Sequence, residues 1–240
     1  MLIENVKPNK AHLKLAELEK QGVKAVSSEG EICDKCKYVF LAIKPQVFDS
    51  VLPKLADHVK EDTVIVSIAA GITEEYIMKT TKDKVHTVIV MPNTPFLLGE
   101  GATALAKGTY TTDEEFEVVK SIFSTGGIAE VVPMDRMKEI IAINGSSPAF
   151  IYLYAKGFID YAKENGIDGD AALRLFAKSL IGSAKVMTES GKTIDELIKM
   201  VSSPGGTTLA GLDGLYQGKL TDVVKDCCER CTKRAYELSK

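Results

Sequence analysis

Three short runs of β-branched and aromatic residues, separated by segments with helical patterning, restrict this chain to few folds. The runs are "KYVFLAI" (37–43), "TVIVSIAAG" (63–71) and "HTVIVMP" (86–92). Continuous apolar runs of this length are typical of strands buried in a parallel sheet. We expect helices between them, one in "PQVFDSVLPKLADHV", opened by Pro45 and broken or kinked at Pro53, and one near "TEEYIMKT". This alternation predicts βαβ units in an α/β, doubly wound sheet.

The second half of the chain has a different pattern. From about Met134 onward strand-like runs end, and long helical patterns follow in "PAFIYLYAKGFIDYAKENG" and "DGDAALRLFAKSLIGSAKVMTESG". Their apolar faces are wider than a small lone bundle needs, which favours burial against a second copy of the chain. We therefore predict two domains, a nucleotide-binding type over residues 1–133 and an all-helical dimerisation type over 134–240.

Composition excludes several classes of protein. A net charge of −3 over 240 residues gives no basic footprint, so nucleic acid is not expected as a partner. No apolar run has membrane-spanning length, and "MLIENVKPNK" lacks the apolar region of a signal peptide. We therefore expect a cytoplasmic protein with no membrane partner.

The cysteines and histidines give no convincing metal pattern. "CDKC" and "CERC" have C-x-x-C spacing, but they lie almost a whole chain apart in helix-like segments, where small apolar side chains usually pack. The odd total of 5 cysteines also argues against a disulfide framework. The histidines have no ligand spacing: His12, His58 and His86. We expect no bound metal and no histidine chemistry.

Candidate binding residues follow the predicted strands. Ligands of open α/β sheets bind at the carboxyl ends of the strands, where "NVKPN", "AIKPQ", "AAGIT" and "MPNTP" bring small residues, prolines, amides and lysines. Any one of these segments is compatible with ordinary turn chemistry, but four along one edge favour a site. A cation after the second strand of a dinucleotide fold suits a 2′-phosphate, so Lys7 favours NADP.

A second candidate is "VSSPGGTTLAGL" (201–212). It lacks the glycine spacing and the lysine of a P-loop, and no predicted strand precedes it. The backbone N–H groups of Gly205, Gly206 and Thr207 at the start of a helix would suit a carboxylate.

These segments, in their order and spacing, resemble the pyrroline-5-carboxylate reductase family, which makes proline. The resemblance covers nearly all of residues 1–240 and rests on "VFLAIKPQ", "SIAAGIT", "VMPNTPFLLGEGATAL", "INGSSPAF" and above all "VSSPGGTTLAGL". It implies a Rossmann-type domain followed by an all-helical domain that interlocks two subunits, as a homodimer or a larger ring. It also implies reduction of 1-pyrroline-5-carboxylate to L-proline with NADPH, or with NADH.

The resemblance assigns residues to both ligands. It places Lys7 at the 2′-phosphate of the cofactor. It also places two segments beside the cofactor, one of Ala42, Ile43, Lys44 and Pro45 and one of Met91, Pro92 and Asn93. Ser203, Gly206 and Thr207 would hold the substrate carboxylate, together with Gly205 from the helix-start argument above. Thr208 would act as the catalytic residue, facing the ring nitrogen. No strong acid is needed, because an iminium already accepts hydride readily. Holding the two reactants in line also lowers the activation barrier, by roughly 7–11 kcal/mol at best.

The chain also departs from the family. Residue 1 aligns with the family's second strand, so the first strand, its glycine-rich loop and the first helix are expected to be missing, giving a truncated Rossmann-like sheet. Asn144 and Ser147 replace small residues, and Glu29 stands where an asparagine is common and would repel phosphate. A catalytically inactive dimeric module is therefore the alternative. A β-hydroxy-acid reductase, using a lysine such as Lys156, Lys163 or Lys185, ranks last.

Overall fold

The computed structural model describes residues 2–3 and 18–239 of the chain; residues 1, 4–17 and 240 are not described. It forms two compact units, one of residues 1–145 with 231–240 and one of residues 146–230. The division predicted from the sequence, between residues 133 and 134, is not settled by these units and stays a prediction. Lys7 and His12 fall outside the described residues.

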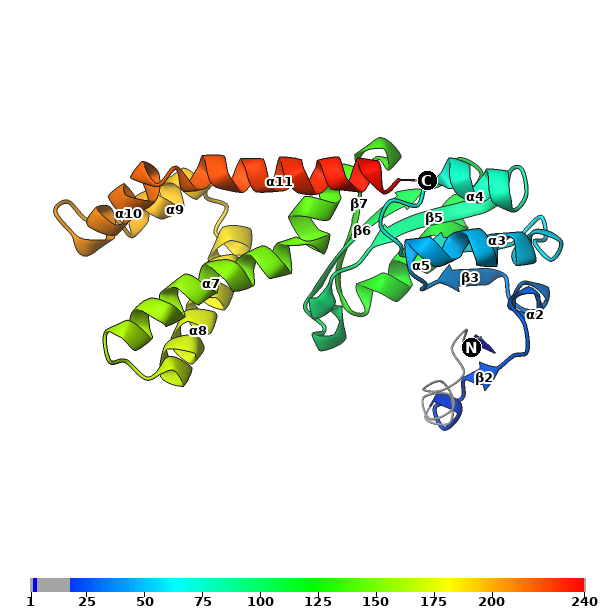
Figure 1. Cartoon of the computed structure of the whole chain (residues 1–240), viewed down its shortest axis with the longest axis horizontal. Coiled ribbons are helices and arrows are strands. Elements are labelled where there is room, and N and C mark those ends of the chain that lie inside the picture. The colour runs from blue at the N-terminus through cyan, green and yellow to red at the C-terminus, as the bar shows by residue number, and fades with distance from the viewer. Residues whose placement is uncertain (1, 4–17, 240) are drawn as a thin grey trace. The chain divides into compact units, whose positions relative to one another are not determined.

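The first unit contains a mixed five-stranded sheet in the order β3-β4-β5-β6-β7 (Figure 1). The first three of these strands are parallel neighbours, β6 is antiparallel to β5, and β7 is parallel to β6. The strands are β3 (Tyr38–Leu41), β4 (Val64–Ser67), β5 (His86–Met91), β6 (Gly101–Lys107) and β7 (Gly127–Val131). The three strands predicted from the apolar runs are confirmed, and β6 and β7 are additional.

Helices cover both faces of this sheet, as a doubly wound arrangement requires. One core cluster joins side chains of α3 and α4 to one face, and a second joins side chains of α5 to the other. The chain passes through α2 (Glu29–Lys35), α3 (Phe48–Ala56), α4 (Glu74–Thr80), α5 (Asp113–Ser124) and α6 (Met137–Ile140). The predicted helix at Pro45 begins as a 3₁₀ turn, Pro45–Val47, and α3 continues through Pro53 without ending there.

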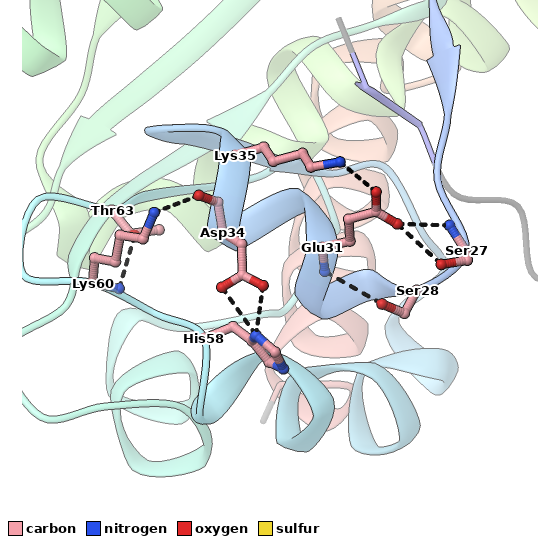
Figure 2. A network of polar contacts seen from close by, with 8 residues as sticks. All are labelled: Ser27, Ser28, Glu31, Asp34, Lys35, His58, Lys60 and Thr63. Atoms are coloured by element: carbon pink, nitrogen blue, oxygen red, sulfur yellow. Dashed lines mark hydrogen bonds and ion pairs between the residues drawn. The ribbon is translucent and has the colours of Figure 1, made fainter.

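Two further strands form a separate sheet. β1 (Leu2–Ile3) pairs in parallel with β2 (Lys24–Ala25), and neither belongs to the five-stranded sheet. The helix after β2, α2, is anchored to the turn before β4, as Figure 2 shows: Asp34 accepts from His58 Nδ1 at 3.0 Å, and Lys60 donates to the Asp34 carbonyl. At its start, the Ser28 hydroxyl accepts from the Glu31 N–H at 3.3 Å.

The second unit is entirely helical, as predicted. Its helices are α7 (Ser147–Glu164), α8 (Gly169–Glu189), α9 (Ile194–Met200), α10 (Thr207–Gln217) and the first part of α11 (Leu220–Glu237). α7 and α8 meet through aromatic rings: the centroids of Phe158 and Phe176 are 4.2 Å apart, and those of Tyr154 and Phe158 are 5.1 Å apart. Many large apolar side chains nevertheless stay exposed, among them Leu153 (72%) and Leu175 (71%).

None of the described helices combines the length and apolar character that crossing a membrane requires.

Candidate functional site

The carboxyl ends of β3, β4 and β5 lie at one edge of the sheet, because these strands are parallel neighbours. Residues 42–45 follow β3, residues 68–71 follow β4, and Pro92 and Asn93 follow β5. Ala42 and Lys44 are exposed there, and Ile43 packs partly against the core below. The structure therefore brings the two cofactor segments expected from the sequence to the same edge.

The side chain of Asn93 is held by the protein at both ends of its amide. Its Oδ1 accepts from the Ala102 N–H at 2.9 Å, and its Nδ2 donates to the Asn144 carbonyl at 3.3 Å. Asn144 in turn donates through Nδ2 to the Met91 carbonyl at 2.7 Å and to the Ala102 carbonyl at 3.1 Å. Sequence reasoning named Asn144 only as a departure from the family and missed this network.

A cavity of about 420 Å³ lies in the first unit, beside the ends of β4 and β5, and Thr73, Glu74, Glu75 and Asp135 are among its polar lining residues. Its apolar lining comes from β5, from the segment after β4 and from residues 134–141: Ile72, Ile89, Met91, Met134, Met137 and Ile141. Lys138 and Tyr236 also line it, with the Lys138 Nζ 4.5 Å from the centre of the Tyr236 ring. A hydrogen bond to Glu139 (2.8 Å) raises the pKa of the Tyr236 phenol.

Glu29 does not carry an uncompensated charge. It is buried at the first position of α2, and Lys54 Nζ lies 2.6 Å from its Oε1. Burial raises the pKa of the Glu29 carboxyl, but the hydrogen bond from Lys54, a backbone hydrogen bond and the Lys54 charge together hold the pKa below its usual value. The repulsion of phosphate expected from the sequence is therefore offset by a neighbouring cation.

The segment Ser203–Thr208 forms a tight turn into α10. The Gly206 N–H donates to the Ser203 carbonyl at 3.0 Å, across Pro204 and Gly205. Gly205 has φ +72, which a type II turn requires at its third residue and which glycine adopts without strain. The residue that caps α10 is Gly206, which has no side chain, so no side chain from this position occupies the first N–H groups of the helix.

These N–H groups make the start of α10 suited to an anion, since they carry the positive end of the helix dipole. Ser203, Thr207 and Thr208 are exposed there and add hydroxyl groups. The structure thus gathers the predicted substrate residues in the second unit and the predicted cofactor segments in the first. Lys156, named for a different reductase, pairs with Asp160 on its own helix.

The cysteines are all free thiols, and Cys33 is fully buried in the core of the first unit. Burial, followed by the nearby Asp34 charge, raises the pKa of the Cys33 thiol to about 11, so it packs as a small apolar side chain. Within the described residues, histidine, cysteine and carboxylate side chains form no group of three or more that could hold a metal ion. The absence of a metal stays a prediction.

Comparison with known proteins adds independent evidence. A family model described as pyrroline-5-carboxylate reductase dimerisation matches residues 135–238, and one described as coenzyme F420-dependent NADP oxidoreductase matches residues 3–71. The chain is 31% identical to pyrroline-5-carboxylate reductase 3 of Danio rerio, over 93% of this chain and 78% of the relative. It is also 31% identical to the Escherichia coli (strain K12) pyrroline-5-carboxylate reductase, over 95% of this chain and 85% of the relative.

A solved structure agrees with these relatives. The pyrroline-5-carboxylate reductase of Coxiella burnetii superposes with a TM-score of 0.88 at 28% identity, covering 100% of this chain and 88% of that one. The Rossmann-like sheet and the helical second part are therefore those expected from the sequence.

Proposed function

Because this chain belongs to the pyrroline-5-carboxylate reductase family, a family of oxidoreductases, we propose that it reduces 1-pyrroline-5-carboxylate to L-proline as the last step of proline biosynthesis. NADPH is the expected reductant, with NADH as the alternative, and the match to an NADP oxidoreductase model supports this choice. The observation that carries the proposal is the Ser203–Thr208 turn at the start of α10, which offers backbone N–H groups and hydroxyls to one small anion.

Each reactant has a proposed place. The substrate carboxylate binds the N–H groups at residues 205–207 and the Ser203 hydroxyl, where the helix dipole favours negative charge. The Thr208 hydroxyl lies one residue further along and would hydrogen bond the ring nitrogen, fixing the C=N bond relative to the cofactor. The cofactor supplies hydride to the imine carbon, and the nitrogen carries the proton that makes the product a secondary amine.

The cofactor would lie along the sheet edge of the first unit. Ala42–Pro45 and Met91–Asn93 are expected beside its nicotinamide half, because both segments end parallel strands at this edge. Lys7 is proposed at the 2′-phosphate. These residues suit the nicotinamide half, whereas the described residues do not include a glycine-rich turn for the pyrophosphate.

We propose a homodimer, built through the second unit, that assembles further into a ring. The match of residues 135–238 to a dimerisation model supports this, as do the exposed apolar faces of α7 and α8. In the dimer, the turn before α10 of one copy would close over the cofactor edge of the other.

A second candidate function is a dimeric module without reductase activity. The separation of the described strands into a β1–β2 sheet and a β3–β7 sheet favours it. In the Rossmann strand order, the strand that carries the pyrophosphate-binding turn lies between these two sets of strands. A domain whose strands are divided at this point would bind the cofactor weakly.

Two measurements distinguish the candidates. Purified chain is mixed with NADPH and 1-pyrroline-5-carboxylate, and loss of NADPH absorbance with formation of proline is followed. In parallel, the melting temperature is measured with and without NADPH, since saturation at about 100 times Kd stabilises a protein by about 2.7 kcal/mol. A folded dimer with no turnover and no shift would support the inactive module and exclude the reductase.

A further inference from the structure

Just past the end of β5, two side chains make the hydrogen bonds to β6 that backbone groups would make in a continued ladder. The antiparallel register pairs Met91 of β5 with Ala104 of β6, so continuing it by two residues would pair Asn93 with Ala102. Instead, the Ala102 N–H donates to Asn93 Oδ1 (2.9 Å), and the Ala102 carbonyl accepts from Asn144 Nδ2 (3.1 Å). The two amides therefore take the positions that the backbone of Asn93 would occupy in the ladder.

The backbone of Asn93 is consequently turned out of the ladder. Its carbonyl accepts from the Phe96 N–H at 3.2 Å, at the start of the 3₁₀ turn Thr94–Leu98. The acceptor that its N–H would use in the ladder is already taken by Asn144. Asn93 lies just past the end of β5, at the sheet edge where the segments expected beside the cofactor also lie.

Asn144 reaches this position from a distorted helix. It is buried (8% exposed) within the π-helix Ile141–Gly145, a rare form that is frequent at functional sites. The next residue, Gly145, sits directly against β5, because an added Cβ would lie 3.2 Å from Met91 Sδ. The π-helix thus places the Asn144 side-chain amide within hydrogen-bonding distance of the end of β5.

We propose that Asn144 is a positioning residue for the nicotinamide half of the cofactor. By bonding the Met91 and Ala102 carbonyls, it keeps Pro92 and Asn93 outside the ladder, beyond the last pair Met91–Ala104, and holds the Asn93 N–H at the edge as a donor for a ligand. This inference rests on the proposed reductase function. The competing explanation is that Asn144 only stabilises the junction of strand and helix.

A matched control exists at the opposite end of the same strand. There the Thr111 hydroxyl accepts from the Thr87 N–H (2.8 Å) and donates to the Thr87 carbonyl (2.6 Å). Thr111 is also buried (5% exposed) and also completes a strand end, but far from the carboxyl edge. Thr111→Val and Asn144→Ala should therefore lower the melting temperature by similar amounts.

The test compares NADPH binding to the two full-length variants and to wild type, by titration of cofactor fluorescence. We expect the Kd for NADPH to rise about tenfold in Asn144→Ala, the effect of losing one or two hydrogen bonds that orient a binding segment. It should stay unchanged in Thr111→Val. Asn144→Ser, whose hydroxyl can donate to one of the two carbonyls, should recover part of the affinity. If Asn144→Ala does not fold, Asn144→Ser takes its place in the comparison with Thr111→Val, and its Kd for NADPH should lie above that of wild type.

The outcomes separate cleanly. An equal rise in Kd in Asn144→Ala and Thr111→Val, or no rise in Asn144→Ala, assigns Asn144 a structural role alone and overturns this inference. A folded wild type that neither binds NADPH nor reduces the substrate overturns the proposed function, and this inference with it.

Discussion

Replacing Gly206 with alanine tests whether the turn before α10 is shaped to hold a carboxylate. A Cβ added at Gly206 would lie 2.6 Å from Ser203 Oγ and 3.0 Å from the Ser203 carbonyl oxygen. Both contacts are too close, so the hydroxyl has to move by most of an ångström. Because Ser203 is exposed, its side chain can rotate away, and the free energy of unfolding should fall by only about 1 kcal/mol.

The larger effect is expected on substrate binding. A hydrogen bond to a charged group contributes about 1.5–3 kcal/mol, which corresponds to roughly 10- to 150-fold in affinity. Because the carboxylate is bound alike before and during hydride transfer, KM for 1-pyrroline-5-carboxylate should rise while kcat changes little. Steady-state kinetics at saturating NADPH measure this, and thermal unfolding of the same samples measures the cost to stability.

Ser203→Ala is the matched control, since it removes the hydroxyl without adding a Cβ at position 206. In that background Gly206→Ala should raise KM little further, because the group that it displaces is already absent. If KM is unchanged in Gly206→Ala, or if the two substitutions multiply their effects, the Ser203 hydroxyl is not displaced from the substrate and the reasoning fails.

Three further predictions concern acid stability, catalysis and assembly. Burial raises the pKa of Glu115, but its hydrogen bonds to the Thr112 backbone, Lys37 and His86 lower the pKa below 4.5. The ionised carboxylate therefore stabilises the fold at neutral pH, and this stabilisation is lost as pH falls through the folded-state pKa. Glu115→Gln should therefore lower the free energy of unfolding in urea by about 2 kcal/mol at neutral pH and by less in acid. An equal loss at both pH values would refute this. Thr208→Val should lower kcat about 10- to 100-fold at unchanged Kd for NADPH, and an unaltered kcat would remove Thr208 from catalysis. Leu153→Glu should shift sedimentation from dimer to monomer, whereas an intact dimer would place α7 outside the interface.

The parallel part of the fold could be predicted because its signals are local. Strands β3 to β5 are continuous apolar runs, and α4 begins where Thr73 caps it by accepting from the Tyr76 N–H at 3.2 Å. β6 was not predicted, because "GATALAK" consists mostly of small residues and its antiparallel direction depends on a partner strand. α5 does have a local signal in the sequence, the capping box between Thr112 and Glu115, which marks the start of a helix.

The site could be predicted only in part. Its segments were recognisable because parallel strands end at one edge, which follows from topology alone. The use of the Asn93 amide could not be foreseen, because the carbonyl that it meets belongs to Asn144, 51 residues away. An asparagine after a strand looks the same whether it binds a ligand or replaces a ladder bond, and only the tertiary structure distinguishes the two.

The two halves of the proposed site rest on supports of different kinds. The sheet edge belongs to a unit with its own core, in which residues such as Phe48, Leu52 and Leu105 are fully buried. Among the residues of the second unit, only Pro148 and Ala162 are buried, although its helices carry many large apolar side chains. Burial of apolar area is the main term that stabilises a fold, so these helices gain most of it only when another copy covers them. We therefore expect the sheet edge to be stable within a single chain, and the helices that carry the proposed substrate turn to gain most of their stability from a second copy.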